Sequence, residues 1–315
     1  MEKLLQQLKN PPKEYRPIPF WSWNDKLDPD MLKWQINEMD KAGLGGYFMH
    51  ARGGLQTKYL GKEWMECIKA CIKEGNKTGM GSWCYDEEGW PSGFAGGIVT
   101  AMGDKYHVRH IEISEVSSKE ELTQNNILGI YRLNNNSGEI KRISLEEVEI
   151  NLNECYKQFV VNHRSNPYYI DILNKDVVKV FIEVTYEKYY KTFKEDFGRG
   201  MPGFFTDEPQ YSRELIPWSY ILPYEFEKRY GYNILDMLPA LFIECKGYEK
   251  FRYDYWGLVN ELYVKSFGEQ IYKWCDQHNC KLTGHIIQED SLLWQMYCCA
   301  GVMPFYEYMH TPGMD

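Results

Sequence analysis

The chain has 315 residues, which is enough for one large domain with a substantial core or for two smaller ones. Its 45 acidic and 36 basic residues give a formal charge of −9, and no basic stripe of the kind that binds nucleic acid is present. It contains no apolar run of about 18 residues that could span a membrane, and its N-terminal segment lacks the apolar centre of a secretory signal. We therefore expect a cytoplasmic protein that binds neither nucleic acid nor a membrane and keeps its nine cysteines reduced.

The N-terminal part of the chain alternates between strand-like and helix-like segments. The expected elements are, in order, a strand at 20–24, a helix over 28–43, a strand at 45–52, a helix over 62–79 and a strand at 80–90. Asp28 is placed to cap the first helix, Pro29 suits its first turn, and Gly79 suits the end of the second. Parallel strands need crossover connections of this length, so the alternation predicts a parallel sheet covered by helices.

A different pattern runs over residues 104–165. Its segments alternate apolar and polar residues with the two-residue period of antiparallel strands, and NNNSGE at 134–139 is a hairpin-turn signal. We expect this part to form a small antiparallel β insertion in the loop after the third strand.

The first pattern then returns. The expected elements are a helix over 176–198, a strand at 201–210, a helical stretch over 221–278 broken near Gly247, a strand at 281–290 and a sixth element at 302–315. We predict an α/β protein with a (β/α)8 TIM-type barrel, made of a first part at 1–103, the β-rich insertion at 104–165 and a continuation at 166–315. A barrel needs eight strands and only five or six are found, so it is expected to be incomplete at the C-terminus. Either its last strands lie in sequence beyond Asp315, which we favour, or the barrel is open or closed by a partner. A doubly wound sheet would carry a glycine-rich phosphate turn, which is missing.

Reactive side chains follow the predicted strands at their C-terminal ends, where the active site of such a barrel lies. Glycoside hydrolysis needs one protonated and one ionised carboxyl group. Glu208 follows the apolar GFF of GFFTDEP, and partial burial beside Asp207 would raise its pKa as a general acid requires. Adjacent side chains of a regular strand point to opposite faces, so we expect only one of the two to face the site and assign Glu208 as the catalytic acid.

Glu289 of GHIIQED is the best second carboxylate, with His285 expected on the same side of the strand. His285 is equally consistent with a core histidine, and an isolated DEP with a strand-end turn. The acidic segment at 85–93 suits sugar hydroxyls, a hard cation such as Ca²⁺ or a solvated loop. The candidate substrate-binding residues are Trp23, His50, Arg52, Asp86, Glu87, Trp90, Asp207 and His285. Neither a GxSxG nor an HExxH motif is present, which leaves serine-hydrolase and zinc-enzyme functions with little support.

Five long motifs stand in order along the chain. They are PFWSWN (19–24), GGYFMHARGGLQTKYLGKEWM (45–65), YDEEGWPSGFAGG (85–97), FFTDEP (204–209) and TGHIIQED (283–290). Together they resemble the family 106 glycoside hydrolases, the α-L-rhamnosidase family, over nearly the whole chain. The resemblance implies an exo-acting, inverting barrel enzyme that cleaves rhamnose-containing glycans or glycosides and binds calcium. Glu208 matches its acid position, and Glu289 matches a motif position that is either the base or a ligand of a calcium ion nearby.

Two alternatives remain open. The strand count also fits a carbohydrate-binding remnant of the same barrel that is catalytically incomplete. A metal-dependent sugar isomerase or lyase also uses carboxylates at strand ends, and it is favoured if Glu208 or Glu289 binds a metal together with His285.

Overall fold

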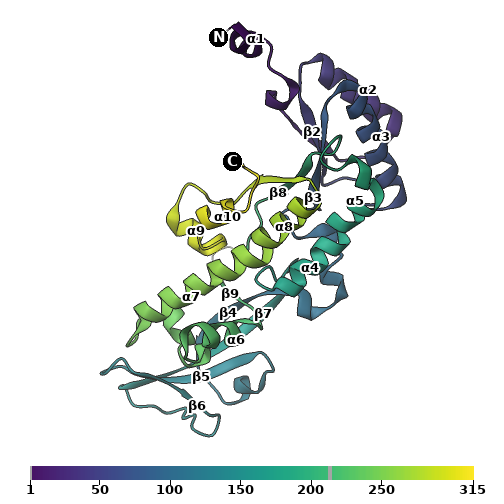
Figure 1. The fold of residues 1–315 in the computed structure, drawn as a ribbon. Helices are drawn as coiled ribbons and strands as arrows, with labels where there is room; N and C mark the ends of the chain where they lie inside the picture. Colours follow the sequence, from purple (N-terminus) through teal and green to yellow (C-terminus); the bar gives the residue numbers. More distant parts are fainter. Residues whose placement is uncertain (1, 212–214) are drawn as a thin grey trace.

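Six parallel strands form the first of two sheets in the computed structural model, which describes residues 2–211 and 215–315 (Figure 1). Their order is β1-β2-β3-β8-β10-β11. The strands are β1 (Phe20–Trp23), β2 (Gly46–Ala51), β3 (Gly81–Glu88), β8 (Gly203–Asp207), β10 (Lys281–His285) and the short β11 (Thr311–Pro312). The predicted strand–helix alternation is therefore confirmed, because its strands pair in parallel with helical crossovers between them.

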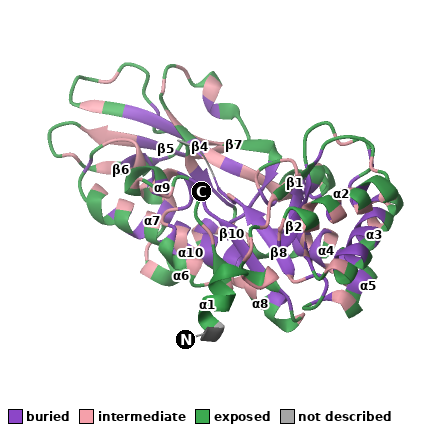
Figure 2. Ribbon diagram, turned by 90° about the horizontal axis from the view of Figure 1, so that it is seen from above, coloured by how far each residue is buried: buried purple, intermediate pink, exposed green. Residues whose placement is uncertain are grey.

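Helices cover one face of this sheet (Figures 1 and 2). They are α2 (Pro29–Lys41), α3 (Lys62–Thr78), α4 (Lys175–Val184), α5 (Tyr186–Phe193) and α8 (Gln270–Gln277). The main core lies between these helices and the strand residues Met49, Cys84, Phe204 and Leu282. The remaining helices are α1 (Glu2–Lys9), α6 (Leu222–Tyr230), α7 (Tyr248–Tyr263), α9 (Leu292–Cys298) and α10 (Met303–Tyr306), with a π-helical segment (Val264–Glu269) joining α7 to α8.

The helix ends follow the chemistry expected from the sequence. The Asp28 side chain accepts hydrogen bonds from the backbone nitrogens of Asp30 and Met31, at 3.0 and 2.8 Å, so it caps α2 as predicted. Gly79 ends α3 with φ +73, a left-handed conformation that costs glycine little. The predicted single helix over 176–198 is wrong, because the non-helical backbone of Thr185 (φ −109, ψ −82) divides it into α4 and α5.

The second sheet is antiparallel and lies at the other end of the elongated molecule (Figure 1). Its order is β6-β5-β7-β4-β9. The strands are β4 (His107–Glu115), β5 (Ile127–Asn134), β6 (Ile140–Ile143), β7 (Tyr156–Ile170) and β9 (Ile216–Trp218). Residues of this sheet such as Ile111, Tyr131 and Val161 belong to the same core as the helices, so the two sheets share one hydrophobic interior.

A closed (β/α)8 barrel is not present within residues 2–211 and 215–315. The parallel sheet is open, because β1 pairs only with β2 at one edge and β11 pairs only with β10 at the other. The antiparallel strands pair with one another and not with this sheet, so they add nothing toward closing it. The observed architecture is thus a mixed α/β fold with an open, six-stranded parallel sheet.

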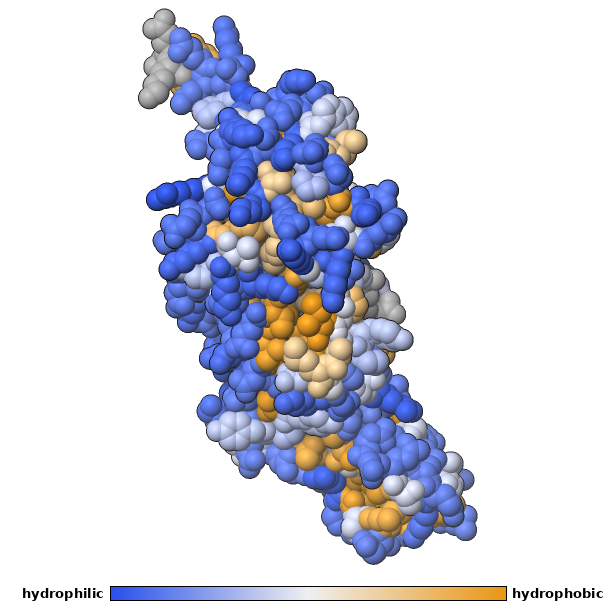
Figure 3. Space-filling model, turned by 90° about the vertical axis from the view of Figure 1, so that its right-hand side faces the viewer, coloured by the Kyte–Doolittle hydropathy of each residue, from blue (hydrophilic) through white to orange (hydrophobic). Residues whose placement is uncertain are grey.

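One side of the molecule is covered mainly by hydrophilic side chains, with a hydrophobic area about midway along its length (Figure 3). None of the described helices has both the length and the apolar character that crossing a bilayer requires. The nine cysteines form no disulfide, and all but Cys155 are buried.

Candidate active site

A cavity of about 500 Å³ opens at the C-terminal ends of the parallel strands. Residues from five strands and their following loops line it: Phe20, Ser22, His50, Arg52, Tyr85, Trp90, Asp207, Glu208, His285 and Asp315. Six of the predicted site residues are thereby brought together, namely His50, Arg52, Trp90, Asp207, Glu208 and His285. This is the edge of a parallel sheet at which ligands bind in α/β proteins.

The two-residue period of the strands explains which side chains reach the cavity. Ser22 pairs with His50, and Asp207 with His285, so these side chains lie on the sheet face away from the helices. Trp23 points to the opposite face, where it is only 2% exposed and its ring packs 5.0 Å from that of Trp64. Trp23 therefore belongs to the core beneath α3 and does not line the cavity.

Glu208 lies one residue beyond β8, and its backbone is in the left-handed region with φ +48. Its backbone nitrogen donates to the carbonyl of His285 at 3.1 Å, which fixes this turn against β10. At Glu208 the side chains no longer alternate between the two faces of the strand, so Asp207 and Glu208 both line the same cavity. The prediction that only one of them faces the site was wrong for this reason.

The Glu208 carboxyl is half-buried, and its Oε2 accepts a 2.8 Å hydrogen bond from Nε1 of Trp90. Burial raises the pKa of Glu208, and the negative charge of Asp207 raises it further. The hydrogen bond from Trp90 acts in the opposite direction because it stabilises the ionised form. The net rise favours a carboxyl group that holds its proton, as a general acid must.

Asp207 and His285 form a close pair beside Glu208. His285 Nε2 lies 3.0 Å from Asp207 Oδ1, and the hydroxyl of Tyr85 donates to Asp207 Oδ2 at 2.7 Å. Burial acts to raise the pKa of Asp207, but these two hydrogen bonds outweigh it and lower the pKa. Burial likewise acts to lower the pKa of His285, and the contact with Asp207 outweighs it and raises the pKa. Asp207 is thus held ionised next to the carboxyl of Glu208.

His50 and Glu87 form a second buried pair, with 3.2 Å between His50 Nε2 and Glu87 Oε1. Burial, followed by the charge of Arg52, lowers the pKa of His50 to about 3. Burial, followed by the charge of Asp207, raises the pKa of Glu87 well above its usual value. The two pKa shifts favour the uncharged forms of both side chains, and the His50 ring stacks on Tyr85 with 3.5 Å between the ring centroids. Glu87 supports His50 and does not itself line the cavity.

Asp86 lies on the helix side of the sheet and is fully buried. Its carboxylate accepts hydrogen bonds from Ser92 Oγ at 2.5 Å and from the Tyr186 hydroxyl at 2.6 Å. The same Ser92 hydroxyl accepts from the backbone nitrogen of Asp207 at 2.6 Å. Burial raises the pKa of Asp86 to about 7. Asp86 therefore anchors the loop after β3 to the end of β8 from below the site.

Glu289 lies outside the strand that was predicted to carry it. β10 ends at His285 and residues 287–290 form a turn, so the expected alignment of His285 and Glu289 on one strand face is wrong. Glu289 Oε1 accepts from the backbone nitrogen of Ile286 at 3.2 Å and from the Tyr306 hydroxyl, and Oε2 accepts from the backbone nitrogen of Asp315 at 3.1 Å. Glu289 lines an adjoining cavity of about 470 Å³ that shares Glu208 and Asp315 with the first.

A metal ion would find its ligands in one place among the described residues. Single ligand atoms of Asp207, Glu208 and His285 all lie within 4.8 Å of one another. Calcium takes six to eight oxygen ligands, whereas this set includes an imidazole nitrogen, which suits a transition metal. Both oxygens of Glu289 are already engaged by donors, so its surroundings do not favour a cation. A calcium ion near Glu289 stays a prediction.

Several residues of the site were not singled out from the sequence. Phe20, Ser22 and Tyr85 line the cavity, and Ser92 and Tyr186 hold Asp86 beneath it. The two-residue period of a strand is the signal for the first three, because it relates Ser22 to Phe20 on β1 and Tyr85 to Glu87 on β3. Nothing in the sequence indicates that α5 brings Tyr186 to Asp86, because the two are 100 residues apart.

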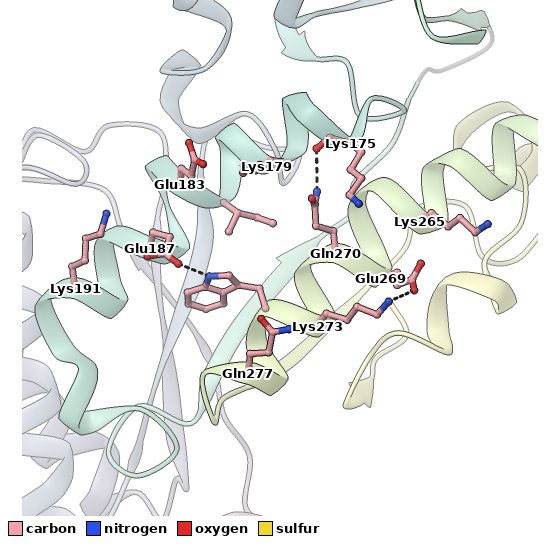
Figure 4. Close-up of a pocket in the computed structure, with 12 residues that line it drawn as sticks. Lys175, Lys179, Glu183, Glu187, Lys191, Lys265, Glu269, Gln270, Lys273 and Gln277 are labelled. Carbon is pink, nitrogen blue, oxygen red and sulfur yellow. Dashed lines mark hydrogen bonds and ion pairs between the residues drawn. The ribbon is translucent and has the colours of Figure 1, made fainter. Parts of the chain in front are cut away.

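A larger cavity of about 840 Å³ lies far from this chemistry, between α4 and α5 on one side and the π-helical segment and α8 on the other (Figure 4). Lysine and glutamate side chains line most of it, and two of the lysines, Lys265 and Lys273, pair with Glu261 and Glu269 four residues earlier. Trp274 Nε1 donates to Glu187 at 2.8 Å, and Gln270 Nε2 donates to the carbonyl of Lys175 at 3.2 Å (Figure 4). It is a groove between surface helices, and we assign it no catalytic role.

No known protein-family model matches the sequence. No curated protein matches it either. Among solved structures, the fold is similar to that of a rhamnosidase from Novosphingobium sp. PP1Y, with a TM-score of 0.60 and 11% sequence identity. The match covers 91% of this chain and 47% of that protein, so the chain spans about half of its length. At this identity the similarity shows a rhamnosidase-like fold and leaves the activity and the family to be argued from the site.

Proposed function

We propose that the protein is a glycoside hydrolase in which Glu208 is the general acid. The observation that carries the proposal is a half-buried carboxyl group with a raised pKa, placed beside the ionised Asp207 in a cavity at the C-terminal ends of parallel strands. An acid in this reaction must keep its proton at working pH until the glycosidic oxygen receives it. Trp90 holds Oε2 of Glu208 in one orientation, and the ionised Asp207 favours the protonated acid, whereas His285, which keeps Asp207 ionised, acts in the opposite direction on Glu208.

The second carboxylate of the reaction is proposed to be Glu289. It lines the adjoining cavity that Glu208 also lines, and hydrogen bonds from Ile286, Tyr306 and Asp315 fix its position. An ionised carboxylate has about four acceptor positions, so one remains for a water molecule. Activation of that water on the far side of the sugar gives inversion, for which the two carboxyl groups are about 6.5–9.5 Å apart.

The proposed substrate is a rhamnose-containing glycan or glycoside that is cleaved from its end. The motif resemblance to α-L-rhamnosidases and the rhamnosidase-like fold support this choice. The aromatic rings of Phe20, Tyr85 and Trp90 in the cavity suit the apolar face of a sugar ring. His50 and Arg52 offer hydrogen bonds to its hydroxyl groups.

Hydrolysis of a rhamnosyl-glucose disaccharide by the wild-type chain and by Glu208→Gln tests the proposal, because its alcohol leaving group needs an acid. We expect turnover by the wild type and its loss in the variant. Binding of rhamnose in calorimetry without any turnover would favour the incomplete, carbohydrate-binding alternative. The predicted calcium site is tested in the same assay, because chelation should then weaken sugar binding and added calcium should restore it.

A second candidate is a metal-dependent sugar isomerase or lyase. The cluster of Asp207, Glu208 and His285 favours it, because these groups could act as ligands in place of acid and base. Elemental analysis of the purified protein and titration with Mn²⁺ and Zn²⁺ separate the two functions. A stoichiometric metal that Glu208→Gln and His285→Gln both remove, with activity that depends on it, would replace the hydrolase proposal.

A further inference from the structure

Besides the two cavities that Glu208 lines, a third cavity of about 280 Å³ adjoins the proposed active site on the side of the antiparallel sheet. Its lining is mostly apolar and comes from both parts of the fold. Trp90 and Pro91 belong to the loop after β3, Val108 to β4, Tyr169 to β7, and Tyr211 and Leu215 to the segment after β8. Arg109, His110, Asn166 and Gln210 supply polar groups at the same cavity.

This cavity is connected to the acid through Trp90. The Trp90 side chain lines both the third cavity and the active-site cavity, and it donates its indole N–H to Glu208. Gln210, which also lines the third cavity, donates from Nε2 to the backbone carbonyl of Glu208 at 3.3 Å. A group that leaves from the oxygen protonated by Glu208 therefore has an apolar cavity next to it.

The walls of the cavity are held in place by hydrogen bonds outside it. The hydroxyl of the buried Tyr169 donates to the carbonyl of Ser92, and that of the buried Tyr211 donates to the carbonyl of Met296. Val108 is paired with Asn166 in the β4–β7 ladder, so two strands fix the wall that faces Trp90. The cavity is thus pre-formed, as small-molecule sites usually are.

We propose that the third cavity is the subsite for the ring of the leaving group, and that the antiparallel sheet serves the enzyme by supplying its outer wall. This inference rests on the proposed hydrolase function. The ligand chemistry is a single ring with an apolar face, which either a second sugar or an aromatic aglycone provides. The adjoining cavity at Glu289 is less suited to such a ring, because the carboxylates of Glu289, Asp290 and Asp315 line it.

In the hydrolysis itself, the proton of Glu208 passes to the glycosidic oxygen as the bond from that oxygen to the anomeric carbon breaks. The bonding electron pair stays on the oxygen, and the leaving group departs as an alcohol or a phenol. Water adds its oxygen to the anomeric carbon and gives one proton to the base. The ring in the third cavity takes no part in these transfers and affects only how well the leaving group is held.

Filling the cavity by Val108→Phe tests the subsite. The three substrates are 4-nitrophenyl α-L-rhamnoside, a rhamnosyl-glucose disaccharide and α-L-rhamnosyl fluoride, whose leaving group has no ring. We expect the variant to lose about tenfold in kcat/KM on a substrate whose ring the cavity binds, with fluoride hydrolysis within about twofold of the wild type. Loss on the disaccharide alone identifies a sugar as the natural occupant, and loss on the aryl glycoside alone identifies an aromatic aglycone.

Two control variants make the result decisive. Val116→Phe makes the same valine-to-phenylalanine substitution just beyond the end of β4, where the residue does not line the cavity, and should not change kcat/KM on any of the three substrates. Asp290→Ala alters the adjoining cavity and should not discriminate between leaving groups. Equal losses on all three substrates in Val108→Phe, or a ring-selective loss in Asp290→Ala, would overturn the proposal.

Calorimetry keeps the test independent of turnover. If the wild type binds rhamnosides without cleaving them, the subsite predicts that 4-nitrophenyl α-L-rhamnoside binds about tenfold more tightly than methyl α-L-rhamnoside, and that Val108→Phe removes the difference. Equal affinities in the wild type would overturn the subsite alone. Failure to bind any rhamnoside would overturn the proposed function together with it.

Discussion

Trp90 donates its indole N–H to Oε2 of Glu208 at 2.8 Å, and this contact joins the loop after β3 to the end of β8 across 118 positions of the sequence. The hydrogen bond stabilises the ionised form of Glu208, whereas burial and the charge of Asp207 favour the protonated form. The pH range in which Glu208 can donate a proton is therefore set by the balance between these contacts.

Replacement of Trp90 by phenylalanine should shift the alkaline side of the pH profile of kcat/KM, where the rate falls, to higher pH. The acid is active while protonated, so the rate falls as the pH rises through the pKa of Glu208. Loss of the Trp90 hydrogen bond removes a contribution that lowers this pKa, and the alkaline side must move upward. Trp274→Phe removes a tryptophan hydrogen bond to Glu187, remote from the site, and should leave the alkaline side in place. A shift to lower pH in Trp90→Phe would contradict the assignment.

Replacement of His285 by glutamine should destabilise the fold more at pH 5.5 than at pH 9. The raised pKa of His285 means that its charged form adds stability below about pH 6.5, the unfolded value, which is lost as the pH rises through the folded value. The lowered pKa of Asp207 means that its charged form adds stability above about pH 3.9, which is lost on acidification. We expect a loss of about 1–3 kcal/mol at pH 5.5 in urea unfolding. His110→Gln, which breaks a more exposed pair with Glu112, should cost under about 1 kcal/mol. Equal losses in His285→Gln at both pH values would argue against the pair.

Replacement of Tyr186 by phenylalanine should lower the free energy of unfolding by about 1–3 kcal/mol, because a buried carboxylate loses a donor. The affected group is the fully buried Asp86, whose carboxylate accepts a 2.6 Å hydrogen bond from the Tyr186 hydroxyl. Tyr190→Phe lies on the same helix and should stay within about 0.5 kcal/mol of the wild type. Chemical denaturation measures both variants. An unchanged stability in Tyr186→Phe would show that Asp86 does not depend on this contact.

Replacement of Glu289 by glutamine tests the proposed base. A base that activates water is needed whatever the leaving group, so kcat should fall by about 10²–10⁴ on both the aryl rhamnoside and the rhamnosyl fluoride. Glu307→Gln makes the same exchange at an exposed residue next to Tyr306; it serves as the matched control and should retain full activity. Near-wild-type rates in Glu289→Gln would reduce this residue to an anchor for Ile286, Tyr306 and Asp315.

The sequence predicted the parallel sheet and most of the cavity, because both follow from local patterns. Helix caps such as Asp28 and strand ends such as Asp207 are determined by short stretches of sequence. Three features depend on contacts between distant segments and could not be read in this way. The left-handed turn at Glu208 is held by a hydrogen bond to the carbonyl of His285 in β10. Trp23 packs against Trp64 in the core, and Glu289 lies beyond the end of β10, where it accepts a hydrogen bond from Tyr306. Nor does strand periodicity indicate whether a parallel sheet closes into a barrel, and this one is open.

The central claim is that Glu208 protonates the leaving group, and the most direct measurement compares two substrates in Glu208→Gln. A rhamnosyl-glucose disaccharide needs an acid, because its leaving group departs as an alcohol, whereas fluoride departs with little assistance. We predict that kcat/KM of the variant falls by at least about 10² on the disaccharide and stays within about tenfold of the wild type on rhamnosyl fluoride. Wild-type disaccharide hydrolysis in Glu208→Gln, or an equal loss on both substrates, would contradict the assignment of Glu208 as the acid.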